Sequence, residues 1–551
     1  MSRGARLLVI GLDGATWSVL DDPTVPLPTL RRLIAGGAAG TLASTMPPMT
    51  LPAWSSILTG VNPGVHGILD FTHRPPGSYG VAFLNATHRR VPTLHELLSA
   101  RGRRVASLTV PGTWPPRPVN GVMVSGFDSP VATRAERGHC LPTSVYDTLS
   151  RRFGGVRFAD FQETALGEGW HDRARDALLR EVGRREAIAR FLLDQERWDL
   201  FMVVFGESDT AAHHFWAQHD AASPRHVPGH ARVLTEVYAR LDAAVERLAH
   251  DAELVCIVSD HGFGGAGTLA LYLNNYLAEM GWLRPAEGLC AGAGDRARRA
   301  ALRLPVERLV RRLPASVLGR VETGTRYGAV DFSQTRAWSD ELSYAPSIHL
   351  NVRGRDPLGT IDDVSAATDD LTRLLYAWRV DGRPVVARVW RRDEVCQGEA
   401  AAGAPDLVLE LAEEGGYTAT LLPSARVART VTSRRLTEAE YPGGKGLGTN
   451  GTHRRPGVLV LHGPAFVPGA RVSGRVEDVL PTLCAALGEA VPDHVEGRVI
   501  AGALRSSIGV PPSAGETPVA PSSPSSPSSP RAWRATEEAG LRRRLVSLGY
   551  L

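Results

Sequence analysis

A chain of 551 residues can hold one large α/β domain with an insertion, or two or three smaller domains. Its 43% hydrophobic and 22% charged residues are typical of a globular protein and exclude a disordered chain. The net charge of +4 is small and its arginines are scattered among acids, which argues against a nucleic-acid partner.

The cysteines and the apolar runs bear on the cellular compartment. The five cysteines lie far apart and form no Cys-x-x-Cys pair, so the sequence predicts neither a disulfide framework nor a cysteine metal site. The first apolar run, Leu7 to Ile10, is too short for a signal peptide, and no stretch approaches the length of a membrane span. We therefore expect a cytoplasmic protein without a membrane partner.

The first half of the chain alternates strand-like and helix-like segments. Apolar runs predict strands at 6–11, 39–43, 104–110, 200–205 and 254–258. Amphipathic spacing predicts helices at 28–36, 92–100, 172–195 and 230–250. Short apolar strands separated by helices are typical of an α/β fold with a mostly parallel central sheet and helices on both faces.

The pattern changes between residues 271 and 441. This region is predicted to contain a helix at 295–318, a strand at 347–352, a helix at 361–378 and a strand at 406–411. We expect it to be an inserted α+β cap between two core segments, 1–270 and 442–507. The second core segment should hold a strand at 457–461 and a helix at 476–487. A disordered Pro/Ser linker at 508–530 and a C-terminal helix at 531–551 should follow.

Carboxylate and imidazole side chains follow or flank the predicted strands. The six residues are Asp13, Asp209, His213, Asp260, His261 and His453. Each alone has an ordinary interpretation as a turn, a helix cap or a surface histidine. Open α/β sheets, however, carry ligands at their strand ends, and carboxylates combined with neutral imidazoles are ligands for divalent ions such as zinc. Six such groups are enough for two ions.

Thr50 begins a predicted helix, where it fits the N-cap, and Pro52 is tolerated in the first turn. The simple interpretation is a capping threonine. A helix N-terminus also favours phosphate, and a metal beside a hydroxyl group turns it into a nucleophile. Two ions roughly 3.5–4 Å apart could clamp the attacking and leaving oxygens of an in-line displacement.

The order of these motifs resembles the alkaline phosphatase superfamily, and within it the type I phosphodiesterase/nucleotide pyrophosphatase branch. The chain looks most similar to bacterial and archaeal predicted phosphohydrolases or phosphomutases. The motifs that carry the resemblance are Asp13, Thr50 with the following Gly60, Pro63 and His66-Gly67, Asp209-x-x-x-His213, Asp260-His261-Gly262 and Gly451-Thr452-His453. The likeness extends from residue 7 to residue 500.

The resemblance implies a metal-dependent phosphoric ester hydrolase of an alkaline phosphatase-like fold, acting on a small phosphorylated substrate. It implies two divalent metals, zinc or, as in mutase-like relatives, manganese. One would be held by Asp209, His213 and His453, and the other by Asp13, Asp260 and His261. Thr50 would bridge the metals and act as the nucleophile.

Other positions leave the substrate open. Relatives that cleave nucleotides carry an asparagine where this chain has Asp70, so an anion-binding donor is missing or comes from the insertion, through Asn274, Asn275 or Lys445. His66 and His214 resemble neighbouring family positions and are expected to serve packing. A phosphomutase or phosphotransferase, and a non-catalytic protein that binds a phosphorylated ligand, remain alternatives.

Overall fold

The computed structural model describes residues 4–80, 82–126, 135–156, 169–286, 330–341, 346–443 and 449–509. The helices predicted at 295–318 and 531–551, residues 510–530 of the predicted linker and Lys445 lie outside the described residues. No helix in these ranges is long and apolar enough to cross a membrane.

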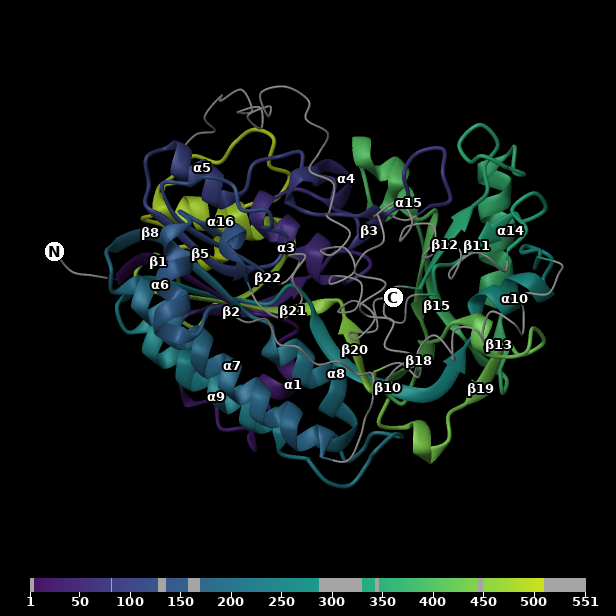
Figure 1. The fold of residues 1–551 in the computed structure, drawn as a ribbon, viewed down its shortest axis with the longest axis horizontal. Helices are drawn as coiled ribbons and strands as arrows, with labels where there is room; N and C mark the ends of the chain where they lie inside the picture. Colours follow the sequence, from purple (N-terminus) through teal and green to yellow (C-terminus); the bar gives the residue numbers. More distant parts are fainter. Residues whose placement is uncertain are drawn as a thin grey trace.

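A nine-stranded sheet forms the first of two structural units, in the order β22-β2-β21-β9-β1-β8-β5-β6-β7 (Figure 1). Its parallel centre consists of β9 (Ala252–Val258), β1 (Gly4–Leu12), β8 (Arg197–Phe205), β5 (Val105–Val110) and β6 (Gly121–Ser125). The predicted mostly parallel α/β fold is therefore confirmed.

The two edges of this sheet depart from the parallel pattern. β21 (Pro456–His462) runs antiparallel to both β9 and β2 (Ala38–Ala43), and β22 (Arg471–Arg475) lies parallel to β2. At the other edge, β7 (Cys140–Leu141) runs antiparallel to β6. Local apolar runs predict strands but carry no information on their direction, so these reversals were not foreseen.

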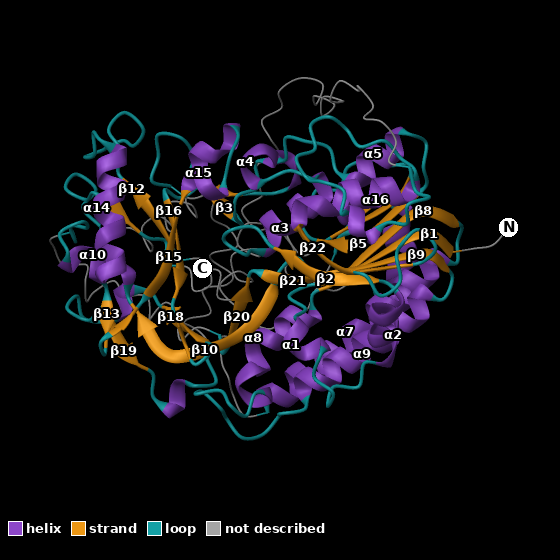
Figure 2. Cartoon of the chain, turned by 180° about the vertical axis from the view of Figure 1, so that it is seen from behind, coloured by secondary structure: helices purple, strands orange, loops and turns teal. Residues whose placement is uncertain are grey.

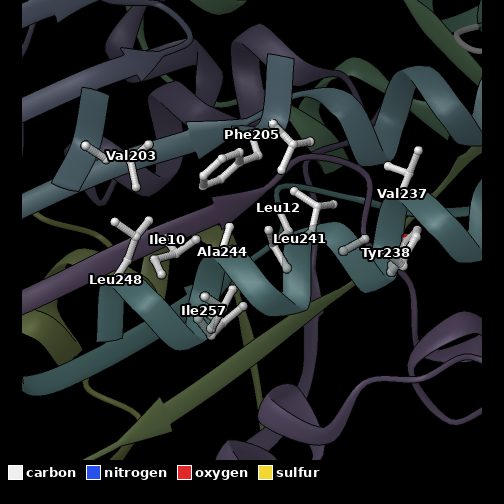
Figure 3. Close-up of a cluster of buried hydrophobic side chains, with 14 of the residues drawn as sticks. Ile10, Leu12, Val203, Phe205, Val237, Tyr238, Leu241, Ala244, Leu248 and Ile257 are labelled. Atoms are coloured by element: carbon white, nitrogen blue, oxygen red, sulfur yellow. The ribbon is translucent and has the colours of Figure 1, made fainter. Parts of the chain in front are cut away.

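Both faces of the sheet are buried, which explains why its central strands are mostly apolar. Leu8, Ile10 and Leu12 face one core and Leu7 and Val9 face the other. The first core is covered by α1 (Trp17–Leu20), α2 (Pro28–Gly36), α7 (Trp170–Leu193), α8 (Glu207–His219) and α9 (Val233–Ala249). In Figure 3, Leu241 of α9 lies among the strand side chains of this core.

The second core lies beneath helices on the opposite face. They are α3 (Thr50–Thr59), α5 (Leu94–Ala100) and α16 (Val479–Leu487). The short helix α4 (Pro63–His66) and the hairpin of β3 (Thr72–His73) and β4 (Ala82–Phe83) also belong to the first unit, whereas α6 (Ser144–Phe153) packs against the first core through Leu149.

A long strand, β10 (Gly262–Leu271), leads from the end of β9 into the second unit (Figure 2). It forms a sheet with β17 (Glu413–Glu414), β18 (Tyr417–Leu421) and β19 (Ser433–Arg435), and its first residues pair with β20 (Gly451–Arg454). The strand ends at Leu271, where the sequence pattern changes.

The rest of the second unit is an α+β arrangement with its own apolar core. Its other sheet has the order β11 (Ala337–Trp338), β12 (Ser347–Leu350), β16 (Leu407–Leu411) and β15 (Val386–Arg391). The remaining elements are α10 (Leu273–Glu279), α14 (Val364–Ala377), α15 (Arg392–Val395), β13 (Arg379–Val380) and β14 (Arg383–Pro384).

Candidate active site

The predicted metal-binding side chains gather where the central strands of the main sheet end. Asp13 follows β1 directly, and Asp260 and His261 stand between β9 and β10. Asp209 lies in the first turn of α8, which begins two residues after β8, and His213 follows one turn later. Parallel strands bring their carboxyl ends to one edge of the sheet, which explains why residues so distant in the chain converge.

Backbone geometry holds the end of β1 against the end of β8. The amide of Asp13 donates to the Phe205 carbonyl at 3.0 Å, and the Ser208 hydroxyl donates to the Asp13 carbonyl at 2.6 Å. Gly14 has a φ of +65°, and a Cβ there would stand 3.2 Å from the Cβ of Asp209. A side chain at this turn would therefore be strained and would crowd a candidate ligand.

Asp209, His213 and His453 form the first cluster. Asp209 Oδ1 lies 3.4 Å from His213 Nε2 and 3.3 Å from His453 Nε2, and the two Nε2 atoms are 3.0 Å apart. His453 comes from β20, where it pairs with Phe263 of β10. The pairing of β20 with β10 is therefore what brings the last predicted ligand to the site.

Asp13, Asp260 and His261 form the second cluster, next to Thr50. His261 Nε2 lies 3.6 Å from Asp13 Oδ1, 3.3 Å from Asp260 Oδ2 and 3.4 Å from Thr50 Oγ1. The His261 and His453 rings are stacked with their centroids 3.7 Å apart. The two clusters therefore adjoin, and ligand atoms of Asp209, His261 and His453 also lie within 4.8 Å of one another.

Hydrogen bonds at Nδ1 identify which nitrogen of each imidazole faces the site. Nδ1 lies 3.2 Å from the Gly451 carbonyl in His213, 3.1 Å from the Gly262 carbonyl in His261 and 2.8 Å from the Pro48 carbonyl in His453. A carbonyl oxygen can only accept, so Nδ1 carries the proton in each neutral ring. All three Nε2 atoms therefore present lone pairs to the carboxylates, the arrangement that orients histidine as a metal ligand.

The carboxylates face these nitrogens with atoms that have no hydrogen-bond donor among the described residues. These atoms are Asp13 Oδ1, Asp209 Oδ1 and Asp260 Oδ2, and all three are buried. Buried polar atoms rarely lack a partner, and lone pairs facing lone pairs at these distances repel each other. A cation between the carboxylate oxygens and the imidazole nitrogens would accept lone pairs from both. These side chains therefore fit divalent metal ions such as zinc.

Burial shifts the pKa values in the direction that such a site needs. It lowers the pKa of His213 and of His453 to about 4 and that of His261 well below its usual range, so the imidazoles are neutral at neutral pH. Burial raises the pKa of Asp13 and Asp260 well above the usual range, and neighbouring carboxylates add to the effect. Without a cation, these two carboxyl groups would therefore tend to bind protons.

Thr50 is the first residue of α3, and the predicted N-cap assignment is wrong by one position. Met49 has the extended φ and ψ of an N-cap, and its carbonyl accepts the first helical hydrogen bond, from Ala53, at 3.0 Å. Thr50 is 1% exposed. Its hydroxyl therefore lies at the positive end of the helix dipole and beside the second cluster.

The other residues considered from the sequence lie in structural settings. His66 Nε2 lies 3.1 Å from the Ser56 hydroxyl, which joins α4 to α3. His214 packs against Trp170, with ring centroids 5.2 Å apart. Asn274 bonds to Ser339 in both directions.

Asn275, the other candidate donor among the described residues, donates to the carbonyl groups of Ala428 and Val431 inside the second unit. Asp70, which stands where nucleotide-cleaving relatives have an asparagine, accepts a hydrogen bond from the amide of Phe71.

Sequence reasoning missed the residues that orient the ligands. Trp54 Nε1 donates to Asp13 Oδ2 at 3.0 Å, and the Thr449 hydroxyl lies 3.1 Å from His213 Nδ1. The one local signal for Trp54 is its position one turn after Thr50 on the same helix. Thr449 has no local signal, because its contact joins segments more than two hundred residues apart.

The chain is similar to a known protein family and to several solved structures. The family model for type I phosphodiesterase/nucleotide pyrophosphatase matches residues 7–421. Human ectonucleotide pyrophosphatase/phosphodiesterase 5 is a similar solved structure, with 13% identity over 89% of this chain and 97% of its own and a TM-score of 0.46.

Phosphonoacetate hydrolase from Sinorhizobium meliloti 1021, solved with phosphonoformate, is 16% identical over 88% of this chain and 96% of its own, with a TM-score of 0.48. No curated protein matches significantly in sequence. The family model matches residues 7–421, which is most of the chain: the protein belongs to the type I phosphodiesterase/nucleotide pyrophosphatase family.

Proposed function

We propose that the protein is a metal-dependent phosphoric ester hydrolase of the phosphodiesterase or pyrophosphatase type, with Thr50 as its nucleophile. Asp209, His213 and His453 would hold one divalent ion, and Asp13, Asp260 and His261 would hold a second. Zinc suits this set of carboxylate and imidazole donors, and manganese is the alternative. When bound, such ions supply positive charge that stabilises the phosphoryl transition state and makes a hydroxyl group or a water molecule more acidic.

One observation carries the proposal. Three buried carboxylate oxygens without a donor among the described residues face three imidazole Nε2 atoms, and the Nε2 of His261 lies 3.4 Å from the buried Thr50 hydroxyl group. Keeping three buried carboxylate oxygens without a donor costs stability, which favours a functional site over a packing role. The family match supports the same reaction class.

The chain's own groups account for the reaction in two displacements. Thr50 Oγ1 attacks phosphorus and forms a P–O bond, the bond to the leaving alcohol or phosphate breaks, and the hydroxyl proton passes to the leaving oxygen. A water molecule then attacks phosphorus of the phosphothreonine; its hydroxyl leaves with the phosphoryl product and its other proton passes to Thr50 Oγ1. The N-terminus of α3 favours negative charge on Oγ1 throughout.

Replacing Thr50 with alanine tests the nucleophile. Metal content and turnover of wild type, Thr50→Ala and Thr59→Ala would be compared on a panel of phosphomonoesters and phosphodiesters. Thr59 is a matched control, because it is buried in the same helix and its hydroxyl bonds to the Ser55 carbonyl. We expect Thr50→Ala to keep its metal and lose at least about 1,000-fold in turnover, while Thr59→Ala stays active.

The same panel separates the proposed hydrolase from its alternatives. Wild-type protein that binds two ions but turns over none of the esters would contradict the proposal in favour of a binding protein. A phosphorylated alcohol as the main product, when an acceptor alcohol is supplied, would identify a transferase or mutase instead.

We also propose a reducing, cytoplasmic location. The four cysteines among the described residues are buried free thiols, which suits a compartment without disulfide formation.

A further inference from the structure

Trp54 lies across β1 beside the candidate ligand Asp13. Its side chain is fully buried, and its Nε1–H donates to Asp13 Oδ2 at 3.0 Å. Gly11 leaves room for the indole ring: a Cβ at Gly11 would stand 2.4 Å from Trp54 Cη2. The ring is therefore held against the strand, two residues before Asp13.

This contact makes the two oxygens of Asp13 unequal. Oδ2 is occupied by the indole N–H, whereas Oδ1 has no donor among the described residues and lies 3.6 Å from His261 Nε2. Oδ1 is therefore the oxygen with both lone pairs open to a cation, while one lone pair of Oδ2 accepts the indole N–H. The hydrogen bond also favours the carboxylate orientation in which Oδ1 faces His261.

Trp54 also connects the candidate nucleophile with this ligand. It stands four residues after Thr50 in α3, so both side chains leave the same side of the helix. The first turn of α3 therefore carries the hydroxyl group, and the next turn carries the indole that donates a hydrogen bond to the carboxylate at the end of β1. The indole sets the distance between these two elements.

We propose that Trp54 is a positioning residue, which orients Asp13 so that Oδ1 is presented to the metal and holds the helix of Thr50 in register with that metal. The inference rests on the proposed function, since it assigns Trp54 a role toward the same metal site. Partners of this kind that orient a ligand typically change metal affinity by about 10–100-fold.

The test removes the indole N–H while preserving the shape of the ring. Trp54→Phe would be compared with a protein carrying β-(3-benzothienyl)alanine at position 54, in which sulfur replaces N–H in a ring of nearly the same shape. Trp198→Phe is the matched control. Trp198 is 1% exposed and its Nε1 donates to the Leu192 carbonyl at 3.0 Å. It lies at the start of β8, whereas the candidate site lies at the other end of this strand.

Three measurements report on the site: zinc affinity by competition titration, the visible absorption spectrum of the cobalt-loaded protein, and the kcat and KM of the metal-loaded protein. We expect both changes at Trp54 to weaken zinc binding by about 10–100-fold, to alter the cobalt spectrum and to lower kcat more than they change KM. Trp198→Phe should lower thermal stability and leave the zinc affinity and the spectrum as in wild type.

The benzothienyl protein keeps the test decisive if Trp54→Phe fails to fold. Wild-type zinc affinity and an unchanged cobalt spectrum in that protein would overturn the role of Trp54. If wild-type protein bound no zinc or cobalt, the proposed function itself would fail, so the two failures are distinguishable.

Discussion

Replacing Asp260 with asparagine should change stability in opposite directions with and without metal. Asp260 Oδ1 accepts from the Gly14 amide at 3.2 Å, while Oδ2 faces the His261 Nε2 lone pair at 3.3 Å. Asparagine can keep the first contact through its oxygen and direct its amide N–H at Nε2. The repulsive contact between Oδ2 and His261 Nε2 would then become a hydrogen bond, but the site would lose one anionic metal ligand.

The expected sizes follow from these contacts. Satisfying a buried group that lacked a partner is worth about 1–3 kcal/mol, so the metal-free variant should be more stable than metal-free wild type by that amount. Loss of one ligand should weaken metal binding by at least about 100-fold, or roughly 3 kcal/mol. The order of stability should therefore reverse when zinc is added.

The stability difference between metal-free Asp260→Asn and metal-free wild type should change with pH in a defined direction. Burial raises the pKa of Asp260 above its value in the unfolded chain, so folding of the metal-free protein favours the protonated carboxyl. The cost of ionising it is absent at low pH and grows as the pH rises through the raised pKa. The advantage of asparagine should therefore be present at pH 8 and should shrink toward pH 4.

Thermal unfolding in chelator and in excess zinc would measure both effects, with Asp242→Asn as the control. Both oxygens of Asp242 already accept backbone N–H groups, from Thr29 and Leu30, so its replacement should destabilise the protein equally with and without zinc. Two results would refute the reasoning. In the first, metal-free Asp260→Asn is less stable than metal-free wild type. In the second, zinc raises the unfolding temperature of Asp260→Asn as much as that of wild type.

Two further predictions concern other parts of the structure. In Gly11→Ala the new Cβ would stand 2.4 Å from Trp54 Cη2 and 2.7 Å from Val204 Cγ2. Chemical denaturation should show a loss of about 1–3 kcal/mol, and zinc affinity should fall because the indole is displaced; unchanged values for both would contradict this. In the second unit, burial raises the pKa of Glu341 to about 7, so wild-type stability should fall by about 2–4 kcal/mol as the pH rises from 4.5 to 7. Glu341→Gln should lose that component of the pH dependence, and an identical pH profile for the variant would argue against it.

Local patterns were sufficient for much of the fold. The helix at 28–36 was predicted with its observed bounds, and the strands ending at Val110, Phe205 and Val258 were found from apolar runs, because strands buried on both faces are mostly apolar. The antiparallel course of β21 could not be predicted in the same way. Strand direction depends on partners that are distant in the chain, and periodicity does not record them.

The candidate site likewise combines residues that the sequence predicts with contacts that only the tertiary structure shows. The sequence alone determined which side chains stand at strand ends, because a carboxylate or imidazole beside an apolar run is a local feature. Only the tertiary structure decided that Asp13 meets His261, that β20 carries His453 to Asp209, and that Trp54 takes one oxygen of Asp13. These contacts join segments far apart in the chain, so they depend on how the sheet and its helices pack in space and not on any local pattern.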